Sequence, residues 1–297
     1  MIKRILKKLF KLMRIDYWSY YRRFILNINT KLLSSALNEQ GYKNLLIDLR
    51  KIVPDISDQY SFSKDTSKEY HELKIRGMHA FQCKLMFRAL DYYKNFSSKI
   101  NVVDIGDSSG AHMLYLKDFM KDKLNIDSYS VNLDPEAIKK IKSKGLKALL
   151  SRAEDLDLGE QKIDFFVSFE MVEHLHNPSI FFRRLTKKSN GNKIVITVPY
   201  RRKSRVGLNY LRNEIKKKVH AENVHIFELC PEDWTKLMLH SGWRVINNEI
   251  YYQYPRKLPL LRKIFAWYWG KIDYEGFWGA ILEKDLTYTE LYQDWES

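Results

Sequence analysis

The spacing of hydrophobic and polar residues changes near residue 99. Before that point apolar side chains recur at helical intervals, which predicts helices over residues 31–60, broken at Pro54, and over residues 67–93. After it, short apolar runs alternate with amphipathic segments. The runs predict seven strands, at residues 100–105, 128–133, 146–150, 162–169, 193–198, 243–250 and 276–282. The segments between them predict helices at residues 111–121, 135–144, 178–188 and 231–241.

Strands that alternate with helices are typical of a parallel sheet with right-handed crossover connections. The sequence therefore predicts an α/β domain over residues 99–284. A helical N-terminal extension, residues 1–98, precedes this domain, and a C-terminal tail, residues 285–297, follows it.

Residues 2–14 have the pattern of a basic amphipathic helix. Six apolar residues recur there at helical spacing among basic residues, and five aromatic residues follow between Tyr17 and Phe24. Such a helix can lie in the plane of a membrane, with residues 2–25 on an anionic surface. The pattern fits equally well a terminal helix that docks on its own domain or on a second subunit, and both interpretations stay open.

The positive charge is concentrated in two segments. The chain has 51 Lys and Arg against 36 Asp and Glu, a formal charge of +15. Residues 1–25 and residues 201–218 each contain eight basic residues and one acid, so together they account for 14 of the 15 charges. The rest of the chain is close to neutral, which indicates two local cationic patches.

Several classes of protein are excluded by composition. No run without a charged residue exceeds the nine residues of 108–116, whereas a membrane-spanning helix needs about 20. The N-terminus lacks the apolar centre and cleavage site of a signal peptide. Cys83 and Cys230 are too far apart in sequence to form a disulfide framework or a zinc motif. We therefore expect a cytoplasmic protein, with any peripheral membrane contact at the inner face.

Small and acidic residues follow the first, second and fourth predicted strands. Residues 104–110 read Asp-Ile-Gly-Asp-Ser-Ser-Gly, a turn that lets the backbone approach a ligand and presents N–H groups to a carboxylate or phosphate. Asp134 follows the second strand, where a carboxylate can accept two ribose hydroxyls. The segment Glu-Met-Val-Glu-His-Leu, residues 170–175, follows the fourth strand.

This series of motifs resembles the class I S-adenosylmethionine (SAM)-dependent methyltransferases, in particular those with E-x-x-E-H-L after the fourth strand, over about residues 99–284. The resemblance implies a Rossmann-like, doubly wound, seven-stranded and mostly parallel sheet whose last strand is antiparallel. It also implies SAM as cofactor, with its amino-acid part at the first turn, its ribose at Asp134, its adenine near residues 153–155 and its methionyl portion over Glu170. Ser108 stands in place of the usual middle glycine of the first turn. The implied cofactor-binding residues are Asp104, Gly106, Ser108, Gly110, Asp134, Ala153, Glu154 and Glu170.

Two other interpretations share part of this pattern. A dinucleotide-binding oxidoreductase has the same glycine turn and acid, but it leaves the Glu173-His174-Leu175 signature unexplained. A non-catalytic scaffold of the same fold is disfavoured because the residues of the cofactor edge are intact. The sequence therefore favours a methyltransferase.

Histidines after the fifth strand are the candidates for a catalytic base. Methyl transfer from a sulfonium is a direct displacement, and a hydroxyl acceptor also benefits from a base that titrates near neutrality. We expect His225, and then His220, in this role; packing beside the helix that begins at Pro231 is the alternative for each. His220, Glu222 and His225 could hold a divalent metal, but their spacing is not diagnostic and hard cations prefer several carboxylates, so no metal is predicted.

The basic segments indicate the acceptor. Residues 201–218 follow the fifth strand at the active-site edge and predict a cationic lid over an anionic acceptor, with a solvated loop as the alternative. Together with residues 2–14 and a basic-aromatic insert, residues 251–275, they favour O-methylation of a sugar or phosphate-bearing glycan of a bacterial envelope, which could be lipid-linked. A nucleic-acid methyltransferase whose patches grip phosphates is the alternative; the chain has no recognisable RNA-binding module. The oligomeric state stays open.

Overall fold

The computed structural model describes residues 17–57, 59, 69–93, 99–159, 163–206, 224–257 and 259–292. Three features of the sequence lie outside these ranges. They are the amphipathic segment 2–14, most of the predicted lid, and the pair His220 and Glu222.

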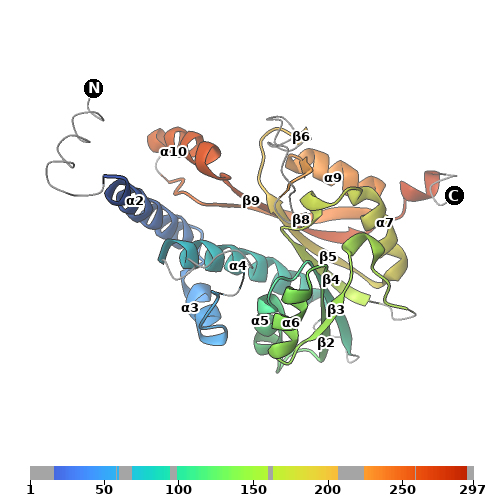
Figure 1. The fold of residues 1–297 in the computed structure, drawn as a ribbon. Helices are drawn as coiled ribbons and strands as arrows, with labels where there is room; N and C mark the ends of the chain where they lie inside the picture. Colours follow the sequence, from blue (N-terminus) through green and yellow to red (C-terminus); the bar gives the residue numbers. More distant parts are fainter. Residues whose placement is uncertain are drawn as a thin grey trace.

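A seven-stranded sheet forms the centre of the molecule (Figure 1), in the order β3-β2-β1-β4-β5-β9-β8. The five strands from β3 to β5 run parallel, whereas β9 is antiparallel to both of its neighbours. The predicted seven-stranded, mostly parallel sheet with an antiparallel last strand is confirmed. The strands are β1 (Ile100–Ile105), β2 (Ile126–Asn132), β3 (Lys147–Leu150), β4 (Ile163–Phe169), β5 (Ser189–Pro199), β8 (Trp243–Tyr252) and β9 (Gly276–Lys284), and a separate pair is formed by β6 (Arg205–Val206) and β7 (Phe227–Glu228).

Helices cover both faces of this sheet, each around its own apolar core. On one face α7 and α9 contribute Phe182, Trp234 and Met238 to the buried cluster. On the other face α4 and α5 contribute Phe81 and Leu116. The helices are α2 (Tyr17–Glu39), α3 (Lys43–Ile52), α4 (Glu69–Leu90), α5 (Ala111–Met120), α6 (Pro135–Ser143), α7 (Pro178–Lys188), α9 (Pro231–His240) and α10 (Pro259–Ile272), with short 3-10 helices at Asp91–Tyr93, Ala153–Asp155, Val172–His174 and Thr289–Leu291.

The helix predicted over residues 31–60 begins and breaks earlier in the structure. The break lies at Gly41, between α2 and α3, and Pro54 comes only after α3 has ended. Gly41 adopts a left-handed φ of +79°, and the N–H of Tyr42 donates to the carbonyl of Leu37 at 2.9 Å. This closure ends a helix with a left-handed glycine, so the predicted position of the break was wrong.

The last helix of the extension packs directly on the sheet. Gln82 on α4 donates its Nε2 to Thr197 Oγ1 on β5 at 3.0 Å, close to the carboxyl end of that strand. The side chain of Phe81, next to it, is fully buried. α4 therefore brings side chains of the extension to the edge at which the parallel strands end.

The predicted insert forms a helix, α10, which contacts the extension. Tyr268 donates its hydroxyl to Asn29 Oδ1 on α2 at 3.0 Å. Across the residues that the structure describes, no helix has both the length and the apolar character needed to cross a membrane.

Candidate functional site

A cavity of about 600 Å³ opens where the parallel strands end. One wall is formed by the loops that follow β1, β2, β3 and β4. The other is formed by α4, by His225 and by Asp273, Tyr274 and Phe277. Of the eight predicted cofactor-binding residues, six line it; Gly110 and Asp134 do not.

The loop after β1 requires glycine at the position that faces the cavity. Gly106 has a φ of +98°, and an added Cβ would lie 2.7 Å from Met171 Cγ. Gly110, at the N-terminus of α5, has a φ of +81°, and its added Cβ would lie 2.5 Å from Leu146 Cδ1. A side chain at either position would strain the backbone and clash. Both glycines are therefore explained by the turn.

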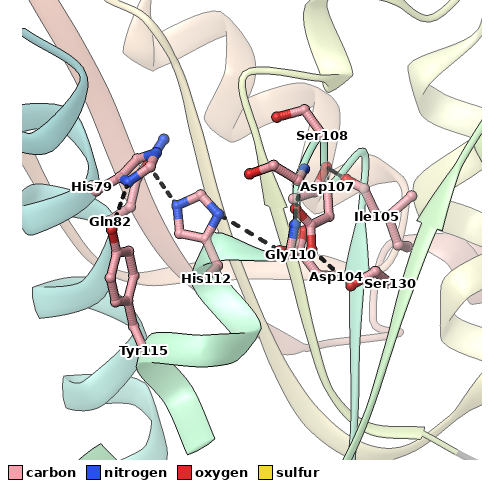
Figure 2. A network of polar contacts seen from close by, with 12 residues as sticks. His79, Gln82, Asp104, Ile105, Asp107, Ser108, Gly110, His112, Tyr115 and Ser130 are labelled. Atoms are coloured by element: carbon pink, nitrogen blue, oxygen red, sulfur yellow. Dashed lines mark hydrogen bonds and ion pairs between the residues drawn. The ribbon is translucent and has the colours of Figure 1, made fainter. Parts of the chain in front are cut away.

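Asp107 occupies the N–H groups of this loop. Its Oδ1 accepts from the backbone N–H of Ser109 at 3.1 Å and of Gly110 at 2.7 Å, and its Oδ2 accepts from Ser130 Oγ at 2.7 Å (Figure 2). The sequence predicted that such N–H groups face a ligand. For the N–H groups of Ser109 and Gly110 that prediction was wrong, because both donate to the side chain of Asp107 in the same loop.

Asp104 presents an unsatisfied carboxylate to the cavity. Its side chain is buried, and within the described part of the chain its Oδ2 has no hydrogen-bond partner, the nearest base being His112 Nδ1 at 3.7 Å. Burial, with the charge of Asp107 second, raises the pKa of Asp104 well above its usual range. Burial lowers the pKa of His112 to about 4, so this imidazole is neutral at physiological pH. A cationic N–H donor from a ligand would satisfy Asp104.

A polar network links α4 to this acid (Figure 2). His112 Nε2 lies 2.9 Å from Gln82 Oε1, and His79 Nδ1 lies 3.3 Å from the hydroxyl of Tyr115. The rings of His79 and His112 meet edge to face at 4.7 Å. These α4 residues were not predicted from the sequence, because its recognisable motifs begin only at residue 104.

Glu170 is held in an unusual backbone conformation. Among described residues it is the one non-glycine with a positive φ, +52°, a conformation that costs energy and is often found at functional sites. Its N–H donates to the carbonyl of Thr197 at 2.9 Å, and its Oε1 has no partner among the described residues. Burial raises the pKa of Glu170 to about 8, although a hydrogen bond with Thr197 opposes the shift.

Asp134 is not part of the cavity wall. Its Oδ1 accepts from the N–H of Glu136 at 2.9 Å and caps α6, whose first residue is Pro135. Asn132, two residues earlier at the end of β2, lines the cavity instead. The position of Asp134 therefore does not support the predicted ribose contact. An aspartate directly before a helix that starts with proline is a capping signal, and it was present in the sequence.

Ala153 and Glu154 line the cavity, but the carboxylate of Glu154 is already engaged. Its Oε1 accepts from the backbone N–H groups of His176 at 2.9 Å and Asn177 at 3.2 Å, and its Oε2 accepts from Arg152 at 3.0 Å. Glu154 thus ties the loop after β3 to the loop after β4.

Gln59, from the extension, braces the glycine turn. Its Nε2 donates to Ser108 Oγ at 2.8 Å, and its Oε1 accepts from Ser109 Oγ at 2.6 Å. The side chain of Gln59 is buried and lines the cavity. Ser108, which replaces the usual glycine, therefore serves as a contact for the extension.

His225, the predicted base, lines the cavity beside His174 of the loop after β4, with the two ring centroids 4.7 Å apart. Its Nδ1 is 2.8 Å from the hydroxyl of Tyr274 and 3.3 Å from Glu228 Oε1, and Tyr274 donates its only proton to Glu228 at 2.9 Å. Burial would raise the pKa of Glu228, but hydrogen bonds from His225, Arg205 and Tyr274 lower it to about 2. With that proton committed, Tyr274 accepts from Nδ1–H, which leaves Nε2 of His225 as the basic nitrogen.

The described part of the predicted lid is paired with acids. Arg201 lies 3.7 Å from Glu228, Arg205 forms an ion pair with the same carboxylate, and Arg202 lies 2.7 Å from Glu275. These three guanidinium groups are partly neutralised within the protein, which the sequence analysis did not anticipate. The remaining cations of segment 201–218, apart from Lys203, lie outside the described residues.

Glu173, His174 and His225 could together hold a divalent metal ion, since each offers a ligand atom within 4.8 Å of the others. Both carboxylate oxygens of Glu173 are buried without a hydrogen-bond partner among the described residues, and burial followed by the charge of Glu170 raises its pKa. His174 donates from Nδ1 to the carbonyl of Val224 at 2.8 Å, which directs Nε2 as the ligand nitrogen. The grouping differs from the one considered in the sequence, of which only His225 is described.

Comparisons with known proteins agree with this geometry. Residues 103–192 match a family described as a methyltransferase domain. No curated protein matches the chain.

Solved structures share the fold at low sequence identity. A putative sarcosine dimethylglycine methyltransferase from Galdieria sulphuraria is 11% identical, with 81% of this chain and 98% of that chain covered and a TM-score of 0.53. The 1,6-didemethyltoxoflavin-N1-methyltransferase of Burkholderia thailandensis, solved with 1,6-didemethyltoxoflavin and S-adenosylhomocysteine, is 13% identical over 82% and 89%, with a TM-score of 0.50. The cyclase SpnF is 12% identical over 84% and 97%, with a TM-score of 0.50. The domain match supports a methyltransferase, and the solved structures share its fold.

Proposed function

We propose that this protein transfers the methyl group of SAM to an oxygen of an anionic acceptor, a sugar or phosphate-bearing glycan of a bacterial envelope. The observation that carries the proposal is the make-up of one cavity. Buried, unsatisfied carboxylates lie on its strand-end wall, and a histidine held by an ionised glutamate lies on the opposite wall.

The residues present fit the cofactor. Asp104 and Glu170 each have a buried oxygen without a described partner, and these two acids suit the ammonium group of an amino acid. Gly106 has no side chain, so a ligand can come close to the backbone of this turn, and Ala153 lines the same wall. Asn132 lines the wall in place of Asp134. Its Nδ2 donates to the carbonyl of Asp107 and its Oδ1 accepts from the N–H of Asp134, so the second lone pair of Oδ1 is what it offers to a ribose hydroxyl. When bound, SAM supplies an electrophilic methyl carbon on a sulfonium.

His225 would remove the proton of the acceptor hydroxyl. Its Nδ1–H is held by Tyr274 and Glu228, so Nε2 can take up the proton and Glu228 stabilises the resulting imidazolium. The proton of the hydroxyl would move to Nε2 of His225 when the acceptor oxygen takes the methyl group and the carbon–sulfur bond of SAM breaks. Glu228 is ionised at physiological pH, which this role requires.

The anionic class of the acceptor is inferred from positively charged residues of the chain. Segment 201–218, with a net charge of +7, follows β5 in the sequence, and Pro199 at the end of that strand lines the cavity. Lys74 of α4, paired with Asp273, also lies in the wall. We include residues 2–25 as a contact to an anionic membrane surface, which would bring a lipid-linked glycan to the site. A nucleic acid is the competing acceptor.

Labelling tests the acceptor directly. The protein would be incubated with methyl-tritiated SAM and with separate bacterial fractions of glycan, lipid-linked glycan and RNA. We expect label in a glycan fraction that is resistant to ribonuclease. Label in RNA alone would exclude the glycan proposal. Loss of all transfer after treatment with a chelator would contradict base catalysis by His225 and indicate instead a metal ion bound by Glu173, His174 and His225.

A further inference from the structure

α10 exposes an apolar face to solvent. Leu260, Ile264 and Trp267 are spaced by four and three residues, so they lie on one face of the helix. Their exposed fractions are 92%, 57% and 61%. The opposite face contributes Ala266 and Trp269 to a buried aromatic cluster. One apolar face of α10 thus packs on the protein, and the other does not.

The basic residues of α10 and of the segment before it indicate which kind of surface this face binds. Residues 256–272 contain five basic residues and no acid. All five are exposed, and Lys271 Nζ lies 4.4 Å above the ring of Trp267. With the carboxylates that the structure describes, Arg262, Lys263 and Lys271 form no ion pair. Contacts between proteins are depleted in lysine, whereas a helix with apolar residues, a tryptophan and unpaired cations is typical of the headgroup region of an anionic bilayer.

The surroundings of α10 agree with such a surface. α2, which meets α10 at the contact between Asn29 and Tyr268, also carries the exposed apolar side chains Phe24 and Ile28. Figure 1 shows α10 projecting beyond the sheet, on the side where α2 begins. The chain passes from α10 directly into Asp273, a residue of the cavity wall.

We propose that α10 docks the protein on an anionic phospholipid surface, with Leu260, Ile264 and Trp267 inserted at the boundary between headgroups and acyl chains. Lys263 and Lys271, three or four residues from Leu260 and Trp267 and so on the same side of the helix, contact lipid phosphates. Docking in this way holds one wall of the cavity close to the membrane. The inference does not depend on the proposed methyl transfer, because vesicle binding is measured without turnover.

Co-sedimentation with vesicles tests the proposal. The full chain and the variant L260S/I264S/W267S are compared on vesicles of phosphatidylglycerol mixed with phosphatidylcholine, so that residues 2–14 are present in both. We expect the variant to bind at least about tenfold more weakly, since three inserted apolar side chains are lost. A matched variant, I246S/L291S, removes two exposed apolar side chains outside α10, one on β8 and one on the last 3-10 helix, and should bind like the parent chain.

A second variant separates charge from apolar contact. R262Q/K263Q/K271Q should lose binding to the mixed vesicles, and added salt should weaken the parent chain in the same way. Circular dichroism and thermal melting confirm that every variant is folded. Unchanged binding of L260S/I264S/W267S would overturn the proposal. The proposal would also be overturned if the parent chain did not bind vesicles and were a dimer that L260S/I264S/W267S converts to a monomer. It would likewise be overturned if R262Q/K263Q/K271Q lost RNA binding but kept vesicle binding.

Discussion

The two walls of the cavity differ in how their charged groups are satisfied. On the strand-end wall, Asp104 and Glu170 each keep a buried oxygen without a described partner. On the opposite wall, Lys74 pairs with Asp273, and Tyr274 donates to Glu228, a residue outside the wall that also pairs with Arg205. An unpaired buried carboxylate costs free energy until a ligand satisfies it, whereas a paired group fixes an orientation. The strand-end wall is therefore suited to bind a ligand, and the opposite wall is suited to hold its side chains in a fixed orientation.

The difference yields a rule that experiments can break. Changes on the strand-end wall should weaken cofactor binding, and changes on the opposite wall should slow methyl transfer while the cofactor still binds. The predictions below test this division.

The largest effect is expected at His225. The variant H225A should lower kcat about 10²–10⁴-fold, the usual contribution of a general base, with SAM affinity nearly unchanged. Transfer is measured with methyl-tritiated SAM and the labelled acceptor fraction, and affinity by calorimetry. H240A, a change of an exposed histidine that bonds Tyr292, is the matched control and should retain activity. Weakened SAM binding in H225A would show that both walls hold the cofactor.

Asp104 should control binding. D104A removes an acceptor for a charged donor, so we expect about 10–100-fold weaker SAM binding by calorimetry. D134A is the control on the same edge: it removes the cap of α6 and should cost about 1 kcal/mol of stability while the affinity stays the same. Equal losses of affinity in both variants would restore Asp134 to the cofactor site.

Glu170 should make stability depend on pH. Its pKa is raised to about 8 in the folded protein, so between its unfolded pKa and pH 8 the folded state keeps a proton that the unfolded state releases. Stability is then lost as pH rises through this window and levels off above it. Relative to E170Q, the parent chain should lose about 1.4 kcal/mol between pH 6 and pH 7 in denaturant unfolding. Parallel pH curves for the two proteins would mean that Glu170 is ionised in the folded state.

Much of the strand-end wall could be predicted from the sequence, and little of the opposite wall. Asp104 lies near the end of β1, and Gly106 and Glu170 directly follow β1 and β4. The apolar runs of these strands are unambiguous, so the meeting of the three residues at one edge follows from parallel topology. His79 and Gln82 lie on a helix whose position on the sheet depends on tertiary packing. The partners of Arg201 and Arg205 are equally hidden, because Glu228 lies more than 20 residues away in sequence.

The smallest effect, at Gln59, would sharpen the comparison most. This residue belongs to the extension, yet it bonds Ser108 and Ser109 on the strand-end wall. Q59A should loosen the glycine turn and weaken SAM binding by about two- to tenfold, the value of one or two hydrogen bonds. If the loss acts through the turn, Q59A/S109A should bind SAM no more weakly than Q59A, because both changes remove the same contact. Additive losses would mean that Gln59 contacts the cofactor instead. A non-additive result would show that the extension builds both walls, one by positioning α4 and the other by bracing the turn.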